Sequence, residues 1–285
     1  MDSSQNSAPS FFQQIAFIGG GNMARSLIGG LIGNGVPATN FAVAEPNARL
    51  RDALAADFDV AAHADNDTAA RAANVIVLAV KPQVMRGVCA GLRDCVQKAK
   101  PLVISIAAGL RVEQLDRWLG GGAAIVRCMP NTPALIGAGA TGLFANAQCS
   151  AAQREAAQGI LAAAGSTAWI GEEGLMDTVT AISGSGPAYF FALVEALENA
   201  AAAQGLPREI ARALASQTCF GAGRMLTEDA ATPAQLRQRV TSPGGTTQAA
   251  LESFNSEGLE AIVARAVAAA TRRGQELSAQ LDDQA

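Results

Sequence analysis

A glycine-rich run that could bind phosphate directly follows the first apolar segment of the chain. Residues 19–24 read Gly-Gly-Gly-Asn-Met-Ala, which is the G-x-G-x-x-A spacing of dinucleotide-binding loops. In such loops the first glycine permits a tight turn, the second lets a pyrophosphate approach the backbone, and the alanine packs a helix against the sheet. The N-terminus of that helix offers free N–H groups to the anion. We therefore predict a dinucleotide site; the alternative is a glycine-rich turn without a ligand.

A glutamate stands where such a site contacts the adenosine ribose. Glu45 follows the second predicted strand, about 20 positions after the glycine-rich run. An acidic group there can accept hydrogen bonds from the ribose hydroxyls and would repel a 2′-phosphate, which favours NADH. Arg49 and Arg51 would reverse that preference if they reached the site, and a solvated glutamate would have no such role. The sequence leaves the choice between NADH and NADPH open.

Other runs rich in glycine, proline and small polar residues follow strands or begin helices. They are Ala-Val-Lys-Pro-Gln at 79–83, Ala-Ala-Gly at 107–109, Met-Pro-Asn-Thr-Pro at 129–133, Ser-Gly-Ser-Gly-Pro-Ala-Tyr at 183–189 and Thr-Ser-Pro-Gly-Gly-Thr-Thr at 241–247. The first three follow predicted strands, so they lie at the carboxyl edge where open α/β sheets bind ligands. One crevice beside the cofactor could therefore collect all three.

The run at 241–247 suits a small carboxylate. Its two glycines let the backbone curve so that successive N–H groups converge, and a helix is predicted to begin at about Thr246. An anion would then sit at the N-terminus of that helix, with serine and threonine hydroxyls as further donors. The alternative is an ordinary helix start without a ligand.

Side chains able to move protons are scarce. The lysines all lie before residue 101, and His63 is the single histidine. Hydride delivery to a carbonyl develops an alkoxide that needs a proton donor, whereas delivery to an iminium ion discharges an existing cation. The composition therefore favours C=N reduction, although Tyr189 or a water molecule could serve as donor. The competing hypotheses are a hydroxyacid dehydrogenase, which would need a base such as lysine on helix 186–204, and a nucleotide-binding oligomer without turnover.

Apolar runs alternate with helical patterns in the first half of the chain, which indicates a parallel sheet with crossover helices. The predicted strands are 15–19, 41–44, 60–62, 75–80, 102–106, 124–128, 141–144 and 167–170. Alanine-rich helical patterns follow at 186–204, 207–227, 232–240, 246–253 and 259–281. The predicted fold is α/β, with a disordered tail at 1–13, a Rossmann-like doubly wound sheet at 14–172 and an all-helical domain at 173–285.

Composition excludes several function classes. Of the 285 residues, 49% are hydrophobic and 16% are charged, and the net charge is −4. This low charge without a basic surplus argues against nucleic acid and anionic membranes, and for burial between subunits. The sequence shows neither the roughly 20-residue apolar stretch of a membrane span nor a signal-peptide pattern, so a cytoplasmic protein is expected. Five cysteines without paired spacing predict neither a disulfide framework nor a metal site.

The glycine-rich loop and the runs that follow it closely resemble the pyrroline-5-carboxylate reductase family. The resemblance covers nearly the whole chain after Phe12, with the motifs in the family's order and spacing. It implies reduction of L-1-pyrroline-5-carboxylate to L-proline by hydride transfer from NADPH or NADH, the last step of proline biosynthesis. It also implies a Rossmann domain and a helical substrate domain that dimerises by intertwining its helices, with dimers often assembled into a ring such as a decamer.

The same resemblance implies the site residues. The pyrophosphate would be held by Ile18, Gly19, Gly20, Gly21, Asn22 and Met23. The adenosine ribose or its phosphate would contact Glu45 and Asn66, and the nicotinamide side would be lined by Ala79, Val80, Lys81, Pro82, Ala107 and Ala108. The substrate carboxylate would bind a loop of the partner subunit, at Ser242, Gly245, Thr246 and Thr247. The Thr247 hydroxyl would act as orienter or proton donor at the ring nitrogen.

The chain departs from the family's pattern at one of these positions. Members that favour NADPH commonly have a small hydroxyl residue in place of Glu45. Lys81 precedes a proline in a cofactor-lining run, which fits a cofactor contact or a structural role better than acid catalysis. His63 is expected at the surface near the third strand, without a catalytic role.

Overall fold

The computed structural model describes residues 14–283, and the predicted tail at residues 1–13 lies outside them. By its internal contacts the chain divides into two compact units. The first unit runs to Gly184 and resumes at Ala270, and the second comprises Ser185–Ala269. The predicted domain boundary between residues 172 and 173 rests on the change in sequence pattern and stays a prediction.

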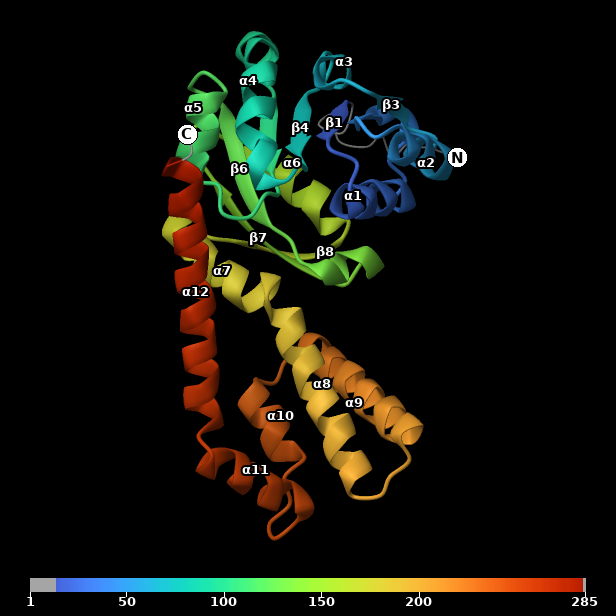
Figure 1. The fold of residues 1–285 in the computed structure, drawn as a ribbon, viewed down its shortest axis with the longest axis vertical. Coiled ribbons are helices and arrows are strands. Elements are labelled where there is room, and N and C mark those ends of the chain that lie inside the picture. Colours follow the sequence, from blue (N-terminus) through green and yellow to red (C-terminus); the bar gives the residue numbers. More distant parts are fainter. Residues whose placement is uncertain (1–13, 284–285) are drawn as a thin grey trace, which may run out of the picture. The chain divides into compact units, whose positions relative to one another are not determined.

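The first unit is built on one sheet with the strand order β3-β2-β1-β4-β5-β6-β7-β8 (Figure 1). Its strands are β1 (Ile15–Ile18), β2 (Phe41–Ala44), β3 (Ala61–His63), β4 (Val75–Leu78), β5 (Leu102–Ser105), β6 (Ala124–Met129), β7 (Gly139–Ala145) and β8 (Gly165–Trp169). All of them overlap predicted strands, with ends that differ by up to two residues. The order of the first six is that of the doubly wound dinucleotide-binding fold, which reverses between β1 and β4.

Helices cover both faces of this sheet, so its central strands are buried on both sides. On one face lie α1 (Asn22–Gly33), α2 (Ala48–Phe58) and α6 (Ala151–Ala162), and on the other α3 (Asn66–Ala70), α4 (Pro82–Ala99) and α5 (Val112–Trp118). Side chains alternate between the two cores along each strand. In β1, for example, Phe17 lies in the same core as Leu27 of α1, whereas Ile18 lies in the same core as Leu92 of α4.

The sheet departs from the predicted parallel arrangement at β7, which runs antiparallel to β6 with Phe144 opposite Arg127. A parallel pair needs a crossover of about a dozen residues or more. The segment between β6 and β7 contains only the short 3-10 helix η3 (Thr132–Ile136), so the chain turns back directly. Helix α6 then provides a crossover, and β8 is parallel to β7.

Three short helical segments follow β8 and end the first stretch of the first unit, at Gly184. They are η4 (Glu173–Leu175), α7 (Met176–Val179) and the π-helix η5 (Thr180–Gly184). The hydroxyls of Thr180 and Ser183 donate to carbonyls four residues earlier, at 2.9 Å each. Side-chain bonds of this kind offer the backbone an alternative to regular helix.

The second unit is all-helical, as predicted. It contains α8 (Gly186–Ala203), α9 (Arg208–Glu228), α10 (Pro233–Arg239), α11 (Thr246–Ser256) and the first part of α12 (Leu259–Asp283). Thr232 and Gln235 exchange side-chain and backbone hydrogen bonds at the start of α10, which is the capping box expected from Thr-Pro-Ala-Gln. None of the helices between residues 14 and 283 combines the length and the hydropathy that crossing a bilayer requires.

Candidate active site

The glycine-rich loop lies where the strand order reverses, between β1 and β4. Gly19 follows β1, and its N–H donates to the carbonyl of Ala44 at the end of β2, 2.9 Å away. Gly19 has a φ of +101°, and a Cβ there would lie 2.6 Å from the carbonyl oxygen of Ala79, just after β4. Only glycine fits such a position. The loop therefore joins the ends of three neighbouring strands, at the edge where open α/β sheets bind ligands.

Helix α1 begins at this loop with an open N-terminus. Its N-cap residue, Gly21, carries no side chain that could bond the first N–H groups. A Cβ at Gly21 would meet no described atom within 4 Å. Asn22 is exposed and Met23 is half-buried in the first turn. Unpaired N–H donors, the helix dipole and free space together fit the pyrophosphate of a dinucleotide.

Glu45 lies beside this loop and is buried, with 8% of its surface exposed. Its carboxylate accepts the N–H groups of Gly20, at 3.0 Å, and Asn47, at 2.9 Å. Asn47 also caps α2, because its side chain accepts the N–H of Leu50. Sequence reasoning did not single out Asn47, although an asparagine just before a helical pattern is a recognisable N-cap signal.

Asn66 is the other residue expected to contact the ribose. It begins α3, just after β3, and is half-buried. Its predecessor Asp65 caps the helix by accepting the N–H of Thr68. His63 ends β3, half-buried, and its carbonyl accepts the N–H of Glu45 at 2.9 Å. Glu45 and Asn66 therefore follow two neighbouring strands, β2 and β3.

The remaining predicted cofactor residues follow β4 and β5. Residues 79–80 are half-buried, and Lys81 is exposed just before Pro82, the first residue of α4. Ala107 is buried and Ala108 is exposed. A cavity of about 260 Å³ lies beside Pro82 and Ala108, and the C-terminal part of α12 also lines it. All the predicted cofactor residues therefore lie along the carboxyl edge of one sheet.

The Met-Pro-Asn-Thr-Pro run is held by Asn131, which is buried. Its amide donates to the carbonyl of Ser183, and its oxygen accepts the N–H of Ala140, both at 2.9 Å. Ser183 opens the Ser-Gly-Ser-Gly run, so one side chain joins two of the motif runs. The sequence marked both runs, but the contact that joins them spans 52 positions and leaves no local signal.

The predicted carboxylate loop forms a tight turn at the start of α11. The Gly245 N–H donates to the Ser242 carbonyl at 3.0 Å, and Gly244 has a φ of +69°. Pro243 before such a glycine is typical of a type II turn. Gly245 is the N-cap residue of α11, and no side chain caps the helix. The first N–H groups of α11, from Thr246 onward, are therefore available to an anion.

Gln248 shapes this turn and was missed by sequence reasoning. Its side-chain oxygen accepts the N–H of Gly244 at 2.7 Å, and its amide donates to Glu252 at 2.8 Å. A glutamine at the third position of a helix is half of a capping box. That spacing could have identified Gln248, although its side chain here bonds Gly244, the residue before the N-cap, and not the N-cap itself.

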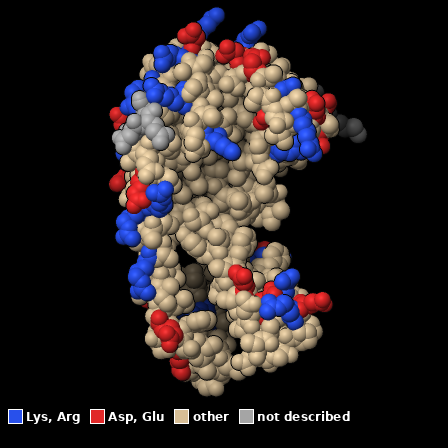
Figure 2. Space-filling model, in the orientation of Figure 1, with Lys and Arg blue, Asp and Glu red and all other residues tan. Residues whose placement is uncertain are grey.

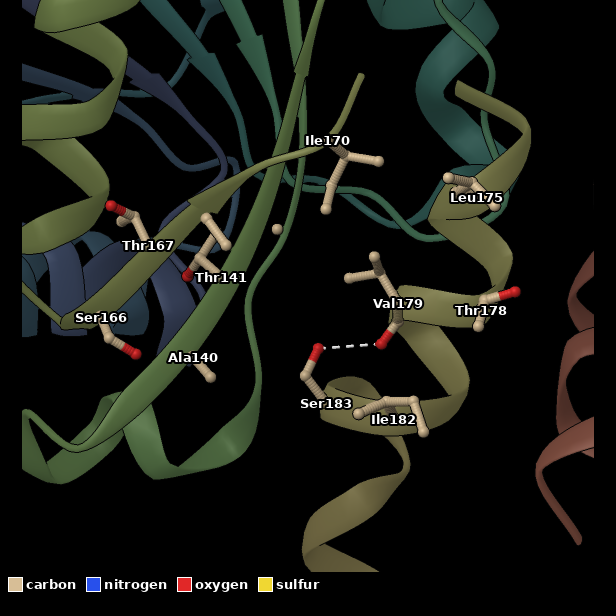
Figure 3. Close-up of a pocket in the computed structure, with 12 residues that line it drawn as sticks. Ala140, Thr141, Ser166, Thr167, Ile170, Leu175, Thr178, Val179, Ile182 and Ser183 are labelled. Atoms are coloured by element: carbon tan, nitrogen blue, oxygen red, sulfur yellow. Dashed lines mark hydrogen bonds between the residues drawn. The ribbon is translucent and has the colours of Figure 1, made fainter. Parts of the chain in front are cut away.

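A larger cavity, of about 390 Å³, lies elsewhere in the first unit. Figure 3 shows it between β7 and β8 on one side and α7 and η5 on the other. Thr141, Ile170, Val179 and Ile182 are among its lining residues, and the Ser183 hydroxyl donates to the Val179 carbonyl beside it. None of the predicted site residues lines this cavity, so its size does not identify the site.

The second unit leaves large apolar side chains uncovered. Phe190 and Phe191 of α8 are 56% and 67% exposed, and Leu214 and Phe220 of α9 are 57% and 59% exposed. On the face shown in Figure 2, acidic and basic side chains are mixed, and broad uncharged areas lie between them. Large exposed apolar side chains on two helices that contact each other favour a protein interface.

Two segments of the chain match known protein families. Residues 173–277 match the family described as pyrroline-5-carboxylate reductase dimerisation, and residues 14–109 match the family described as NADP oxidoreductase, coenzyme F420-dependent. The dimerisation match indicates an oligomer.

Three relatives that cover nearly the whole chain are reductases of pyrroline carboxylates. A pyrroline-5-carboxylate reductase of Pseudomonas aeruginosa is 50% identical over 94% of this chain and 98% of its own length. A solved pyrroline-5-carboxylate reductase of Coxiella burnetii is 43% identical over 93% of this chain and 98% of its own, with a TM-score of 0.91. A Plasmodium falciparum pyrroline carboxylate reductase with NADP bound is 29% identical over 93% and 98%, with a TM-score of 0.80. The chain belongs to the pyrroline-5-carboxylate reductase family.

Proposed function

We propose that this chain reduces L-1-pyrroline-5-carboxylate to L-proline with NADPH or NADH, as the last step of proline biosynthesis. The observation that carries the proposal is the 50% identity to a reductase of this name along 94% of the chain. Two uncapped helix N-termini, at α1 and α11, add physical support, because each suits one of the two anionic ligands.

The cofactor would lie along the carboxyl edge of the sheet. Residues 18–23 would hold its pyrophosphate, and Glu45 and Asn66 would contact the adenosine ribose. Residues 79–82, with residues 107–108, would line the nicotinamide side. The open start of α1 and the close approach of Gly19 to Ala79 support this assignment. When bound, the cofactor supplies the hydride.

The substrate carboxylate would bind at the start of α11. Ser242 and Gly245 shape the turn, and Thr246 and Thr247 offer N–H and hydroxyl donors to the anion. The Thr247 hydroxyl would orient the ring nitrogen or give it a proton. A cationic C=N bond needs no strong acid for hydride addition, which suits a chain with so few lysines and histidines.

We further propose a homodimer, with the carboxylate loop supplied by the partner subunit and dimers assembled into a decamer. The exposed phenylalanines of α8 and the match to a dimerisation family support the dimer. A cytoplasmic location is proposed as well, because the five cysteines are free, as is usual in reducing compartments. Sedimentation analysis of the purified protein tests the assembly.

The reaction is tested by following NADH and NADPH oxidation, each titrated separately, with pyrroline-5-carboxylate as substrate. We expect saturable turnover with proline as the product. Measurable nucleotide binding without turnover would refute the proposed reaction and favour a non-catalytic, nucleotide-binding oligomer. Turnover of 2-hydroxy acids instead would favour the hydroxyacid dehydrogenase.

A further inference from the structure

A π-helical turn ends the first stretch of the first unit. This turn, η5, runs from Thr180 to Gly184 directly after α7. π-helices are rare and occur frequently at functional sites. Gly184 lies against the side chain of Met129, whose Cε would be 2.6 Å from a Cβ at Gly184. The turn therefore packs on the residue that ends β6.

Side-chain donors bond the carbonyls of α7 and η5. The Thr180 hydroxyl donates to the Met176 carbonyl at 2.9 Å. The Ser183 hydroxyl donates to the Val179 carbonyl at 2.9 Å, as Figure 3 shows. The Ser183 carbonyl accepts a third bond of 2.9 Å, from the amide of Asn131. Because each bond satisfies a backbone carbonyl, the three donors together stabilise this irregular turn.

Asn131 joins the turn to two other segments. It is buried, with 9% of its surface exposed, and its side-chain oxygen accepts the N–H of Ala140 in β7 at 2.9 Å. It is the N-cap residue of η3, where asparagine usually bonds the helix backbone, but its side chain bonds these distant partners instead. The amide faces a carbonyl and the oxygen faces an N–H, so a flipped amide would lose both bonds. Its own loop, β7 and η5 are therefore held in one arrangement.

The loop that contains Asn131 lies beside the proposed nicotinamide side. Strands β5 and β6 are parallel neighbours, with Ser105 opposite Arg127. The residues that follow Ser105 therefore run beside those that follow Arg127, at the carboxyl edge where ligands bind. Beyond β5 the chain reaches Ala107 and Ala108, which would line the nicotinamide side, and beyond β6 it reaches Asn131. A shift of Asn131 would move the backbone next to the position proposed for the reacting ring.

We propose that Asn131 is a positioning residue for the reduction. The inference rests on the proposed function and deepens it. Asn131 would touch neither the cofactor nor the substrate, and it would act by fixing residues 129–131 against η5. Hydride transfer depends steeply on alignment, and a displacement of about 1 Å can cost about a hundredfold in rate. The pyrophosphate and the substrate carboxylate would be held elsewhere, at α1 and α11. Loosening Asn131 should therefore slow turnover and leave ligand binding nearly unchanged.

Steady-state kinetics and cofactor binding of two matched variants test this. Asn131→Asp removes the amide donor at nearly constant size and keeps an acceptor for Ala140. We expect kcat to fall about tenfold to a hundredfold, with the KM of pyrroline-5-carboxylate and the Kd of the cofactor that the native protein oxidises within about threefold.

Asn146→Asp is the matched control. The Asn146 amide donates to the Ala123 carbonyl at 2.8 Å, and its oxygen accepts the Ile125 N–H at 3.1 Å. Asn146 thus bridges backbone groups as Asn131 does, but at the opposite end of β6. Thermal unfolding should show that this variant is destabilised too, whereas its kcat should stay within about twofold of the native value.

Ser183→Ala gives a second test that leaves Asn131 in place, because it removes only the hydroxyl bond to the Val179 carbonyl. We expect it to lower kcat about threefold to tenfold. Native kcat in folded Asn131→Asp, a loss confined to ligand binding, or an equal loss of kcat in Asn146→Asp would overturn the inference. If Asn131→Asp does not fold, native kcat in Ser183→Ala overturns it. Absence of turnover in the native protein would instead refute the proposed function, and this inference with it.

Discussion

Replacing Gly19 by alanine should destabilise the fold, whereas replacing Gly21 by serine should weaken cofactor binding alone. Gly19 has a φ of +101°, and an added Cβ would lie 2.6 Å from the carbonyl oxygen of Ala79. An added Cβ at Gly21 would meet no described atom within 4 Å. The two substitutions stand two positions apart in one loop, so Gly21→Ser serves as the stability control for Gly19→Ala.

The magnitudes follow from these surroundings. At Gly19, the left-handed conformation costs roughly 1–2 kcal/mol for a residue with a Cβ, and relieving the contact with Ala79 brings the total to about 2–4 kcal/mol. The midpoint of thermal unfolding should therefore fall by roughly 5–15 °C. At Gly21, serine is a good N-cap residue, so stability should stay within about 0.5 kcal/mol of the native value.

The cofactor effect is expected at Gly21 because the serine hydroxyl would bond the N–H groups that the pyrophosphate needs. Loss of one or two such contacts should weaken NADH binding about tenfold to a hundredfold, which corresponds to about 1.4–2.7 kcal/mol. Thermal unfolding and fluorescence titration with NADH measure the two effects separately. Native-like affinity in Gly21→Ser would refute the phosphate-binding role of this helix start. Native-like stability in Gly19→Ala would refute the backbone argument.

Three further changes test other parts of the molecule. Thr247→Ala should lower kcat/KM for pyrroline-5-carboxylate about tenfold to a hundredfold through loss of a positioned donor. Thr247→Ser keeps the hydroxyl and should retain most of the native kcat/KM. Native kinetics in the alanine variant would remove Thr247 from the mechanism. Hydrogen bonds from Arg212, which have the larger effect, and from Arg208 lower the pKa of Glu198 below its usual 4.5. Glu198 should therefore stabilise the fold above pH 4.5 and lose this contribution as the pH falls through its lowered pKa. Unfolding followed between pH 3 and 6 should show this loss in the native protein and less of it in Glu198→Gln, and equal pH profiles would contradict the argument. Phe191 is 67% exposed in the single chain and belongs to the proposed interface. Phe191→Glu should therefore dissociate the oligomer, because it places a charge in that interface. An unchanged sedimentation profile would place the interface elsewhere.

Local sequence patterns were enough to predict the strands and the long helices of the second unit, but not the short segments η4, α7 and η5. Runs such as Val75–Leu78, buried at every position, have no polar alternation to confuse with an amphipathic helix. Likewise, the Thr-Pro-Ala-Gln start of α10 combines a capping box with an early proline. The reversed direction of β7 was missed because strand patterns carry no direction, and only the length of the connection between β6 and β7 could have indicated it.

The local structure of the candidate site was predictable where one segment of chain builds it and not where distant segments meet. The turn at Ser242–Gly245 and the start of α11 come from a single run, and both lie where the sequence placed them. The bonds of Glu45 to Gly20 and of Asn131 to Ser183 join segments 25 and 52 positions apart. No local pattern specifies such contacts, because they depend on which strands become neighbours.

The division of α12 between the two units has a consequence for how the protein is made. Its last turns belong to the first unit, where Leu281 packs against one of the two cores of the sheet and lies near Gly109. A ribosome releases these residues only after the whole of the second unit. The nucleotide-binding unit therefore begins to be synthesised before the second unit but cannot complete its core until the second unit has been made. A chain that stops a few residues early would carry every residue of the proposed site and still lack part of the packing that supports it.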